Sequence, residues 1–159
     1  MTIDPLTTAA FTGHRTYDDS ASEQLHNAIR MLYASGYRTF MSGMAAGFDL
    51  AAAEAVLALK GEMADLRLVC VIPFEGQARR FAESVRERYE RVVEAADEVV
   101  TLAPHYTVDA YFRRNDFLTD HSTAVIAYLS DRKSGTAYTV RRALRRHSRV
   151  INLCDNPIF

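Results

Sequence analysis

Short apolar runs alternate along the chain with longer segments whose apolar residues recur every three or four positions. The runs predict β-strands at residues 8–12, 37–41, 66–72, 98–102, 123–129 and 150–153. The run at 66–72 is nearly continuous and rich in β-branched residues, a pattern typical of a strand covered on both faces. This pattern favours a parallel sheet.

The segments between these runs predict helices. Ser20 and Glu23 have the spacing of a capping box that opens the first helix, and Gly36 is expected at its C-terminal end. The other helices are expected at about residues 50–60, across residues 81–96, at about 109–120, and after Gly135. Six strands alternating with five helices predict an α/β fold: a single doubly wound Rossmann-like domain over residues 1–159, with a mostly parallel six-stranded sheet.

Several glycines directly follow the expected strands. In doubly wound sheets, ligands bind outside the carboxyl ends of the strands. Gly13, Gly43, Gly76 and Gly135 are therefore expected to share one face of the molecule.

The turn at residues 42–49, Ser-Gly-Met-Ala-Ala-Gly-Phe-Asp, stands between a predicted strand and a predicted helix. A helix N-terminus carries unpaired N–H groups and partial positive charge, and glycines let a phosphate approach the backbone. The turn therefore predicts an anion site, although such turns also serve only to reverse the chain. Asp49 is either a helix-capping residue or an acceptor for a ribose hydroxyl group.

Glu54 is the only charged residue between positions 50 and 59. The helix around it is apolar on all sides and is therefore expected to be buried. A buried carboxylate needs a partner, a proton or a cavity. Because helical side chains lean toward the N-terminus, Glu54 can point back at the glycine turn as a ligand contact. The alternative is a structural carboxylate bonded to backbone or to an arginine.

Composition favours a small-molecule partner. The 159 residues are 48% hydrophobic and 25% charged, and a net charge of −1 creates no field that attracts nucleic acid or an anionic membrane. Cys70 and Cys154 form no metal-ligand motif and fit a reducing cytoplasm. Neither a leader sequence nor an apolar run of the ~18 residues that span a membrane is found. No metal or cofactor is expected to be required.

Four motifs occur in a specific order and spacing. They are Phe11-Thr12-Gly13-His14-Arg15, the turn from Ser42 to Asp49 with Glu54, Ile72-Pro73-Phe74-x-x-Gln77, and Arg114-Asn115 with Asp120-His121-Ser122. Together they resemble the YpsA-like family of the SLOG superfamily over nearly the whole chain. The resemblance implies a Rossmann-like fold, a nucleotide or ADP-ribose-like ligand, and a homo-oligomer.

The resemblance also implies site residues. Arg15 suits a phosphate through its bidentate guanidinium, whereas His14 is either a ligand contact or a hydrogen-bonded loop residue. Gln77 can bond a base edge or cap a helix. A solvated face is the simpler account of Arg114 and Asn115, and only the resemblance assigns them to the ligand. The remaining implied ligand-binding positions are Gly13, Ser42, Gly43, Met44, Gly47, Asp49, Glu54, Pro73, Phe74, Gly135 and Thr136.

One departure concerns catalysis. The segment around Gly135 resembles the motif Pro-Gly-Gly-x-Gly-Thr-x-x-Glu of the LOG phosphoribohydrolases, which belong to the same superfamily. This chain keeps Gly135-Thr136 but has Thr139 at the position of the glutamate. A hydroxyl group cannot supply the charge or the proton transfer of a carboxylate. Binding or sensing is therefore favoured over N-glycosidic hydrolysis, for which Glu54 and Asp49 are the remaining catalytic candidates.

A basic stripe near the C-terminus gives a third alternative. Arg142, Arg145, Arg146 and Arg149 follow a spacing of three, four and seven residues, and the superfamily includes the DNA-processing protein DprA. Such a stripe can follow the backbone of single-stranded DNA. The acidic total charge and the lack of interleaved aromatic residues argue against this alternative. A solvated or subunit-contacting face is favoured, and nucleic acid is not the expected partner.

Overall fold

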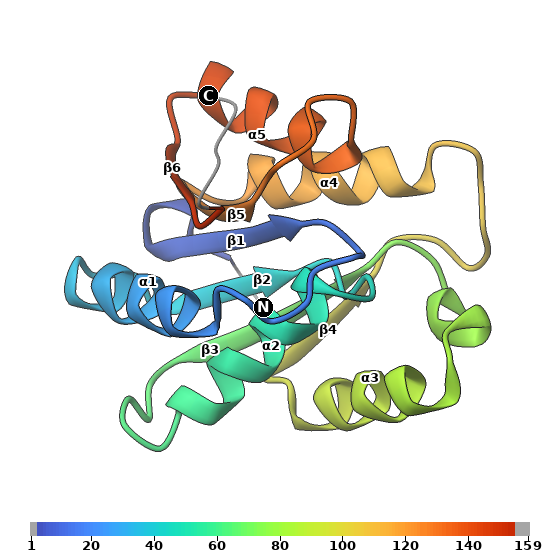
Figure 1. Ribbon diagram of the computed structural model, residues 1–159, viewed down its shortest axis with the longest axis horizontal. Coiled ribbons are helices and arrows are strands. Elements are labelled where there is room, and N and C mark those ends of the chain that lie inside the picture. Colours follow the sequence, from blue (N-terminus) through green and yellow to red (C-terminus); the bar gives the residue numbers. More distant parts are fainter. Residues whose placement is uncertain (1–2, 155–159) are drawn as a thin grey trace.

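The computed structural model describes residues 3–154, which form one six-stranded sheet covered by helices on both faces (Figure 1). All five pairs of neighbouring strands are parallel, and the strand order is β4-β3-β2-β1-β5-β6. The predicted α/β architecture is therefore confirmed. The strands are β1 (Thr8–Gly13), β2 (Thr39–Ser42), β3 (Arg67–Ile72), β4 (Glu98–Thr101), β5 (Ala124–Tyr128) and β6 (Arg149–Asn152).

The chain winds away from β1 in two directions. It first steps outward through β2 and β3 to β4, then returns to place β5 on the other side of β1. Three helices cover one face of the sheet and two cover the other (Figure 1). The first face is covered by α1 (Ser22–Ala34), α2 (Phe48–Leu59) and α3 (Glu83–Ala95), and the second by α4 (Ala110–Asp120) and α5 (Gly135–Arg145). Two short 3-10 helices, η1 (Pro5–Thr7) and η2 (Gln77–Arg80), lie in the connecting segments.

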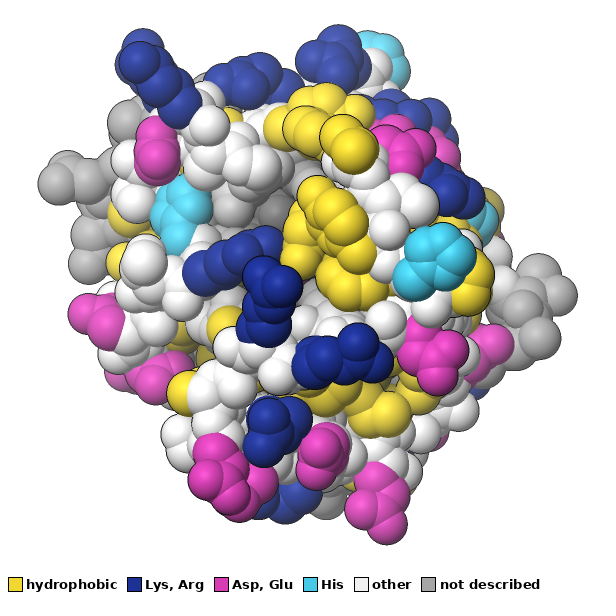
Figure 2. Space-filling model, turned by 90° about the vertical axis from the view of Figure 1, so that its right-hand side faces the viewer, with side chains coloured by type: hydrophobic (Ala, Val, Ile, Leu, Met, Phe, Trp, Pro, Cys, Tyr) yellow, Lys and Arg dark blue, Asp and Glu magenta, His cyan; other side chains and the backbone are white. Residues whose placement is uncertain are grey.

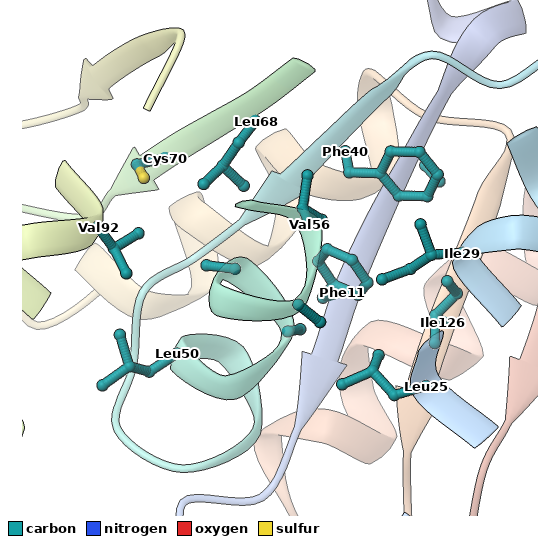
Figure 3. Close-up of a cluster of buried hydrophobic side chains, with 14 of the residues drawn as sticks. Phe11, Leu25, Ile29, Phe40, Leu50, Val56, Leu68, Cys70, Val92 and Ile126 are labelled. Carbon is teal, nitrogen blue, oxygen red and sulfur yellow. The ribbon is translucent and has the colours of Figure 1, made fainter. Parts of the chain in front are cut away.

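Alternate strand residues supply the two cores. Phe11 and Phe40 stack at a centroid distance of 5.9 Å beneath α1 and α2 (Figure 3). Their strand neighbours Ala10 and Met41 point to the opposite face and pack with Leu118 of α4. Burial on both faces explains why the strands read as continuous apolar runs.

The capping box predicted for the first helix is wrong. Helix α1 begins at Ser22, and Ala21 occupies the N-cap position without a side-chain hydrogen bond. The Ala21 amide donates instead to the Tyr17 hydroxyl at 3.2 Å, and the Ser20 hydroxyl lies 3.3 Å from the hydroxyl of Tyr128. The Ser20 hydroxyl is thus engaged with the end of β5 instead of with the amides at the start of α1. The predicted end of the helix is confirmed, since Gly36 has a positive φ of 105°.

Candidate functional site

A pocket of about 340 Å³ lies at the carboxyl edge of the sheet, where the chain leaves β1 and β5 in opposite directions. Doubly wound folds bind ligands at this switch point because the diverging loops leave a crevice. The glycine turns meet at one edge, as the sequence predicts. The pocket is lined by Thr12, Gly13, His14, Arg15, Ala45, Asp49, Tyr111, Arg114, Asn115, Leu118, Ser134, Gly135 and Thr136.

Asp49 is the buried acid of this pocket. It stands in the first turn of α2 with 5% of its surface exposed. Its Oδ2 atom accepts a long hydrogen bond of 3.4 Å from the Ala45 amide, and Oδ1 has no hydrogen-bond partner among the described residues. Burial raises the pKa of Asp49 to about 6, an effect that attraction to Arg114 and the nearby amides of Ala45 and Gly13 partly offset. The Gly13 amide lies close to this carboxylate but does not meet the geometry of a hydrogen bond to Oδ1.

Arg114 supplies the buried guanidinium group of the pocket. Its Nη1 donates to the Gly43 carbonyl oxygen at 2.7 Å, and its Nε donates to Asn115 Oδ1 at 2.8 Å. Burial lowers the pKa of Arg114, and the nearby Asp49 carboxyl opposes that shift. Arg114 and Asn115 therefore do not form the solvated face that is simplest from sequence; Arg113 is the exposed residue of this segment.

Helix α5 points its N-terminus at the same pocket. The Ser134 hydroxyl caps this helix by accepting from the Ala137 amide at 3.1 Å. A Cβ atom added to Gly135 would meet nothing within 4 Å, so space is open beside the free amides of this turn. Gly135 and Thr136 both line the pocket, and the geometry suits an anion. Thr139 is buried one turn deeper, where its hydroxyl donates to the Gly135 carbonyl oxygen at 3.1 Å.

His14 and Arg15 follow β1 and line the pocket from the other side. The backbone amide of Ser130 donates to His14 Nε2 at 2.9 Å, so this imidazole joins the loops after β1 and β5. Burial lowers the pKa of His14, which favours the neutral ring that accepts this bond. The hydrogen-bonded role considered from sequence is thus present. Arg15 is exposed, and its guanidinium carbon lies 5.2 Å from the centre of the Tyr111 ring.

The glycines of the turn at residues 42–49 serve the packing of the chain. A Cβ atom at Gly43 would lie 2.6 Å from Arg114 Cδ, and one at Gly47 would lie 2.4 Å from the backbone oxygen of Arg15. Gly47 also has a positive φ of 84°, and buried Met44 has one of 61°. The Ser42 hydroxyl donates to the Asp49 carbonyl oxygen at 2.8 Å. The turn therefore presents Ala45 and Asp49 to the pocket, while Ser42, Gly43, Met44 and Gly47 lie outside its lining.

The segment after β3 borders a different cavity. Phe74 and Gln77 line a neighbouring space, and Pro73 is buried outside both linings. The Gln77 amide nitrogen donates to the Gly43 carbonyl oxygen at 3.1 Å, and its oxygen accepts from the Tyr89 hydroxyl at 3.3 Å. Both ends of the Gln77 amide are thus bonded within the protein.

Glu54 does not meet the expectation of a buried carboxylate facing the turn. Its side chain is 37% exposed and points at α3, where Arg88 Nη2 donates to its Oε1 at 2.5 Å. The arginine partner considered from sequence is therefore present. The reason is the packing of α2 against α3, which brings Arg88 beside Glu54. Glu54 also lines a separate cavity of about 250 Å³ with residues of α1 and α2, away from the glycine turn.

Five lining residues were missed from sequence: Thr12, Ala45, Tyr111, Leu118 and Ser134. Spacing could have identified two of them. Tyr111 and Leu118 stand three residues before and four residues after Arg114 on α4, so all three share one helical face.

The basic stripe is partly neutralised. Arg142 pairs with Asp116 at 3.2 Å and with Asp120 at 2.7 Å, and Arg146 lies 3.4 Å from Asp120. Arg149 stands in β6, beyond the end of the helix.

Within residues 3–154, no three His, Cys, Asp or Glu side chains gather to hold a metal ion. No helix in that range is long and apolar enough to cross a membrane.

Comparisons with known proteins agree with this architecture. The model of the YspA SLOG family matches residues 10–153. A UPF0398 protein of Bacillus cereus (strain B4264) is 25% identical over 130 residues, which cover 80% of this chain and 71% of that protein. A UPF0398 protein of Bacillus thuringiensis (strain Al Hakam) is 29% identical over 108 residues, covering 67% of this chain and 59% of its own length.

Two solved structures share the fold. DNA processing protein A (DprA) of Streptococcus pneumoniae superposes with a TM-score of 0.67 at 18% identity, and the match covers 91% of this chain but 49% of DprA. DprA of Helicobacter pylori, solved for its single-stranded DNA binding mode, gives a TM-score of 0.67 at 19% identity over 92% of this chain and 64% of its own. This chain therefore spans about half to two thirds of those longer proteins.

Proposed function

The chain belongs to the YspA SLOG family, and on that premise we propose that it binds a nucleotide-derived ligand in the pocket between β1 and β5. The pocket offers groups for two parts of such a ligand. A buried carboxylate on α2 suits ribose hydroxyl groups, and the N-terminus of α5 suits a phosphate.

One observation carries the proposal: Asp49 Oδ1 is buried without a hydrogen-bond partner in the wall of a pocket. Native proteins pair nearly all buried polar atoms, so an unpaired carboxylate oxygen indicates a missing donor. A ribose has two adjacent hydroxyl donors that a carboxylate can accept. Asn115, beside Arg114, adds a second polar group to the same wall.

The phosphate is proposed to lie at the amides of Gly135 and Thr136. This helix start has room for it, and Arg15 lines the pocket as an exposed guanidinium. The proposal differs from the sequence-based assignment of the phosphate to the turn at residues 42–49. There Asp49 Oδ2 already faces the Ala45 amide, and a second anion would be repelled.

The test is isothermal titration of AMP, GMP and ADP-ribose into the wild type and two matched variants. Asp49→Asn removes the charge of the buried acceptor, and Glu54→Gln makes the same chemical change on the same helix outside the pocket. We expect Asp49→Asn to weaken binding by roughly tenfold or more, as the loss of a charged hydrogen bond implies, and Glu54→Gln to leave it unchanged. Equal affinities of the wild type and Asp49→Asn would refute the proposal.

N-glycosidic hydrolysis is the second candidate, and the raised pKa of Asp49 is the observation that favours it. A carboxyl group with a pKa of about 6 in a pocket can exchange protons near neutral pH. Against it stands Thr139, whose buried hydroxyl is bonded to its own helix. We therefore rank binding or sensing first.

Single-stranded DNA is the third candidate, favoured by the binding mode for which the Helicobacter pylori DprA structure is described. In this chain, acidic neighbours pair with Arg142 and Arg146 of the basic stripe, which reduces its attraction for phosphates. We propose that the partner of this protein is a small nucleotide ligand and that no resident cofactor is required. We also propose that the protein forms a homo-oligomer and is located in the cytoplasm. Cys70 and Cys154, both free and buried, are consistent with that location.

A further inference from the structure

A second and larger cavity adjoins the pocket. It measures about 1020 Å³ and is formed by the segment after β3 and the loop before α4. Arg15 and Tyr111 line both spaces, so the two are neighbours across these side chains. Figure 2 shows this edge of the molecule, where basic and hydrophobic side chains gather side by side.

Aromatic rings form one wall of the second cavity. Phe74 lies 5.5 Å from Tyr106 and 5.8 Å from Tyr111 between ring centres, both in edge-to-face geometry. Tyr106 is 56% exposed. An edge-to-face cluster leaves ring faces free for a further planar group, and nucleobases stack on such faces whatever their sequence.

Positive charge lines the same cavity. Arg15, Arg79 and Arg80 are exposed lining residues, and none of them forms an ion pair with the described residues 3–154. The lining carries one acid, Glu75. Aromatic rings beside unpaired arginines suit a planar ring that is attached to phosphate rather than an aliphatic ligand.

We propose that this cavity is a ring-binding subsite, and that the two spaces together hold a ligand of two nucleosides joined by a pyrophosphate. One nucleoside occupies the pocket of Asp49, the pyrophosphate bridge extends from the amides of Gly135 and Thr136 to Arg15, and the second base stacks on Tyr106. This inference rests on the proposed function and deepens it. It explains why the space at the strand ends extends well beyond a pocket of about 340 Å³.

The test is titration with AMP and GMP and with the symmetrical dinucleotides diadenosine diphosphate and diguanosine diphosphate. Two variants form a matched pair: Tyr106→Ala in the second cavity and Phe112→Ala outside both, which remove rings that are 56% and 53% exposed. We expect the wild type to bind a dinucleotide at least tenfold more tightly than its mononucleotide. Tyr106→Ala removes that gain and leaves mononucleotide affinity unchanged, whereas Phe112→Ala changes neither affinity.

Each contrary outcome has a distinct meaning. Mononucleotide binding without a dinucleotide gain, or a gain that survives Tyr106→Ala, overturns the second subsite and leaves the proposed function standing. Absence of all binding to the wild type overturns both. A six-nucleotide single strand that binds more tightly than the dinucleotides at physiological salt would replace the small ligand by single-stranded DNA.

Discussion

Arg114 Nη1 donates a hydrogen bond of 2.7 Å to the backbone carbonyl oxygen of Gly43. The arginine side chain also fills the space that a Cβ atom at Gly43 would need, since Arg114 Cδ would lie only 2.6 Å from it. The glycine after β2 and the arginine of α4 are therefore one structural unit. The absence of a side chain at Gly43 leaves room for Arg114, and the hydrogen bond from Arg114 fixes the turn after β2.

We expect Gly43→Val to displace Arg114 and to lower the free energy of unfolding by about 1–3 kcal/mol, the usual cost of overpacking a filled site. Urea denaturation measures the change. Gly135→Ala is the control, because a Cβ atom there meets nothing within 4 Å, and we expect no loss of stability. A Gly43→Val variant as stable as the wild type would show that Arg114 moves aside freely.

Asp49 makes stability depend on pH. Its pKa is raised from 3.8 to about 6 in the folded protein, so the folded state holds a proton that the unfolded chain releases. Between these values the free energy of unfolding therefore falls as pH rises. We expect Asp49→Asn to remove this fall and to be more stable than the wild type above the upper value, by up to about 3 kcal/mol.

Denaturant titrations of both proteins from pH 4 to pH 8 check this expectation, because subtracting one curve from the other cancels the remaining carboxylates. A constant difference over that range would mean that Asp49 does not titrate there. The same residue is expected to make ligand affinity fall below about pH 6, since a protonated carboxyl accepts hydroxyl donors less well.

Glu54→Gln is expected to have small effects. The Glu54 and Arg88 side chains are 37% and 36% exposed, and ion pairs at such positions contribute about 0–1 kcal/mol. We expect a fall in the free energy of unfolding within this range and unchanged nucleotide affinity. Loss of ligand binding in this variant would restore Glu54 as a ligand contact.

We expect the protein not to release free base efficiently from AMP, GMP, CMP or UMP. Thr139 stands at the position where the resemblance to the LOG phosphoribohydrolases implies a glutamate, and the loss of one preorganised electrostatic group costs roughly a hundredfold to a thousandfold in rate. Chromatography of reaction mixtures measures the products. Turnover at about 1 per second or faster would favour the enzyme. Abolition of that turnover in Asp49→Asn would identify the acid.

The basic stripe is expected not to bind single-stranded DNA with submicromolar affinity at physiological salt. Arg142→Ala should instead lower stability, because it removes the contacts of Arg142 with Asp116 and Asp120. Exposed Arg145, for which no ion pair is found within residues 3–154, is the matched control. Tight DNA binding that weakens with salt at a log–log slope near −0.7 per phosphate, and that is lost in Arg145→Ala, would contradict this prediction.

The fold could be predicted from the sequence because its signals are local. Nearly continuous, β-branched runs such as residues 66–72 are typical of strands covered on both faces, and their alternation with helices favours a parallel sheet. The position of the site followed from the same logic, since the carboxyl ends of parallel strands share one edge. Gly13, Asp49 and Gly135 were brought to one pocket as expected.

The roles of individual side chains were decided only by tertiary structure. A glycine in the sequence does not show whether a phosphate or another part of the chain approaches its backbone. At Gly43 and Gly47 the approaching group is another part of the chain. From sequence, Arg114 is expected at the surface, but in the fold it packs over Gly43 and donates to its carbonyl oxygen. Glu54 is expected to be buried, but in the fold it pairs with Arg88 of α3 at a partly exposed position. Sequence spacing reports the neighbours within one helix or strand, whereas these partners stand 71 and 34 residues away.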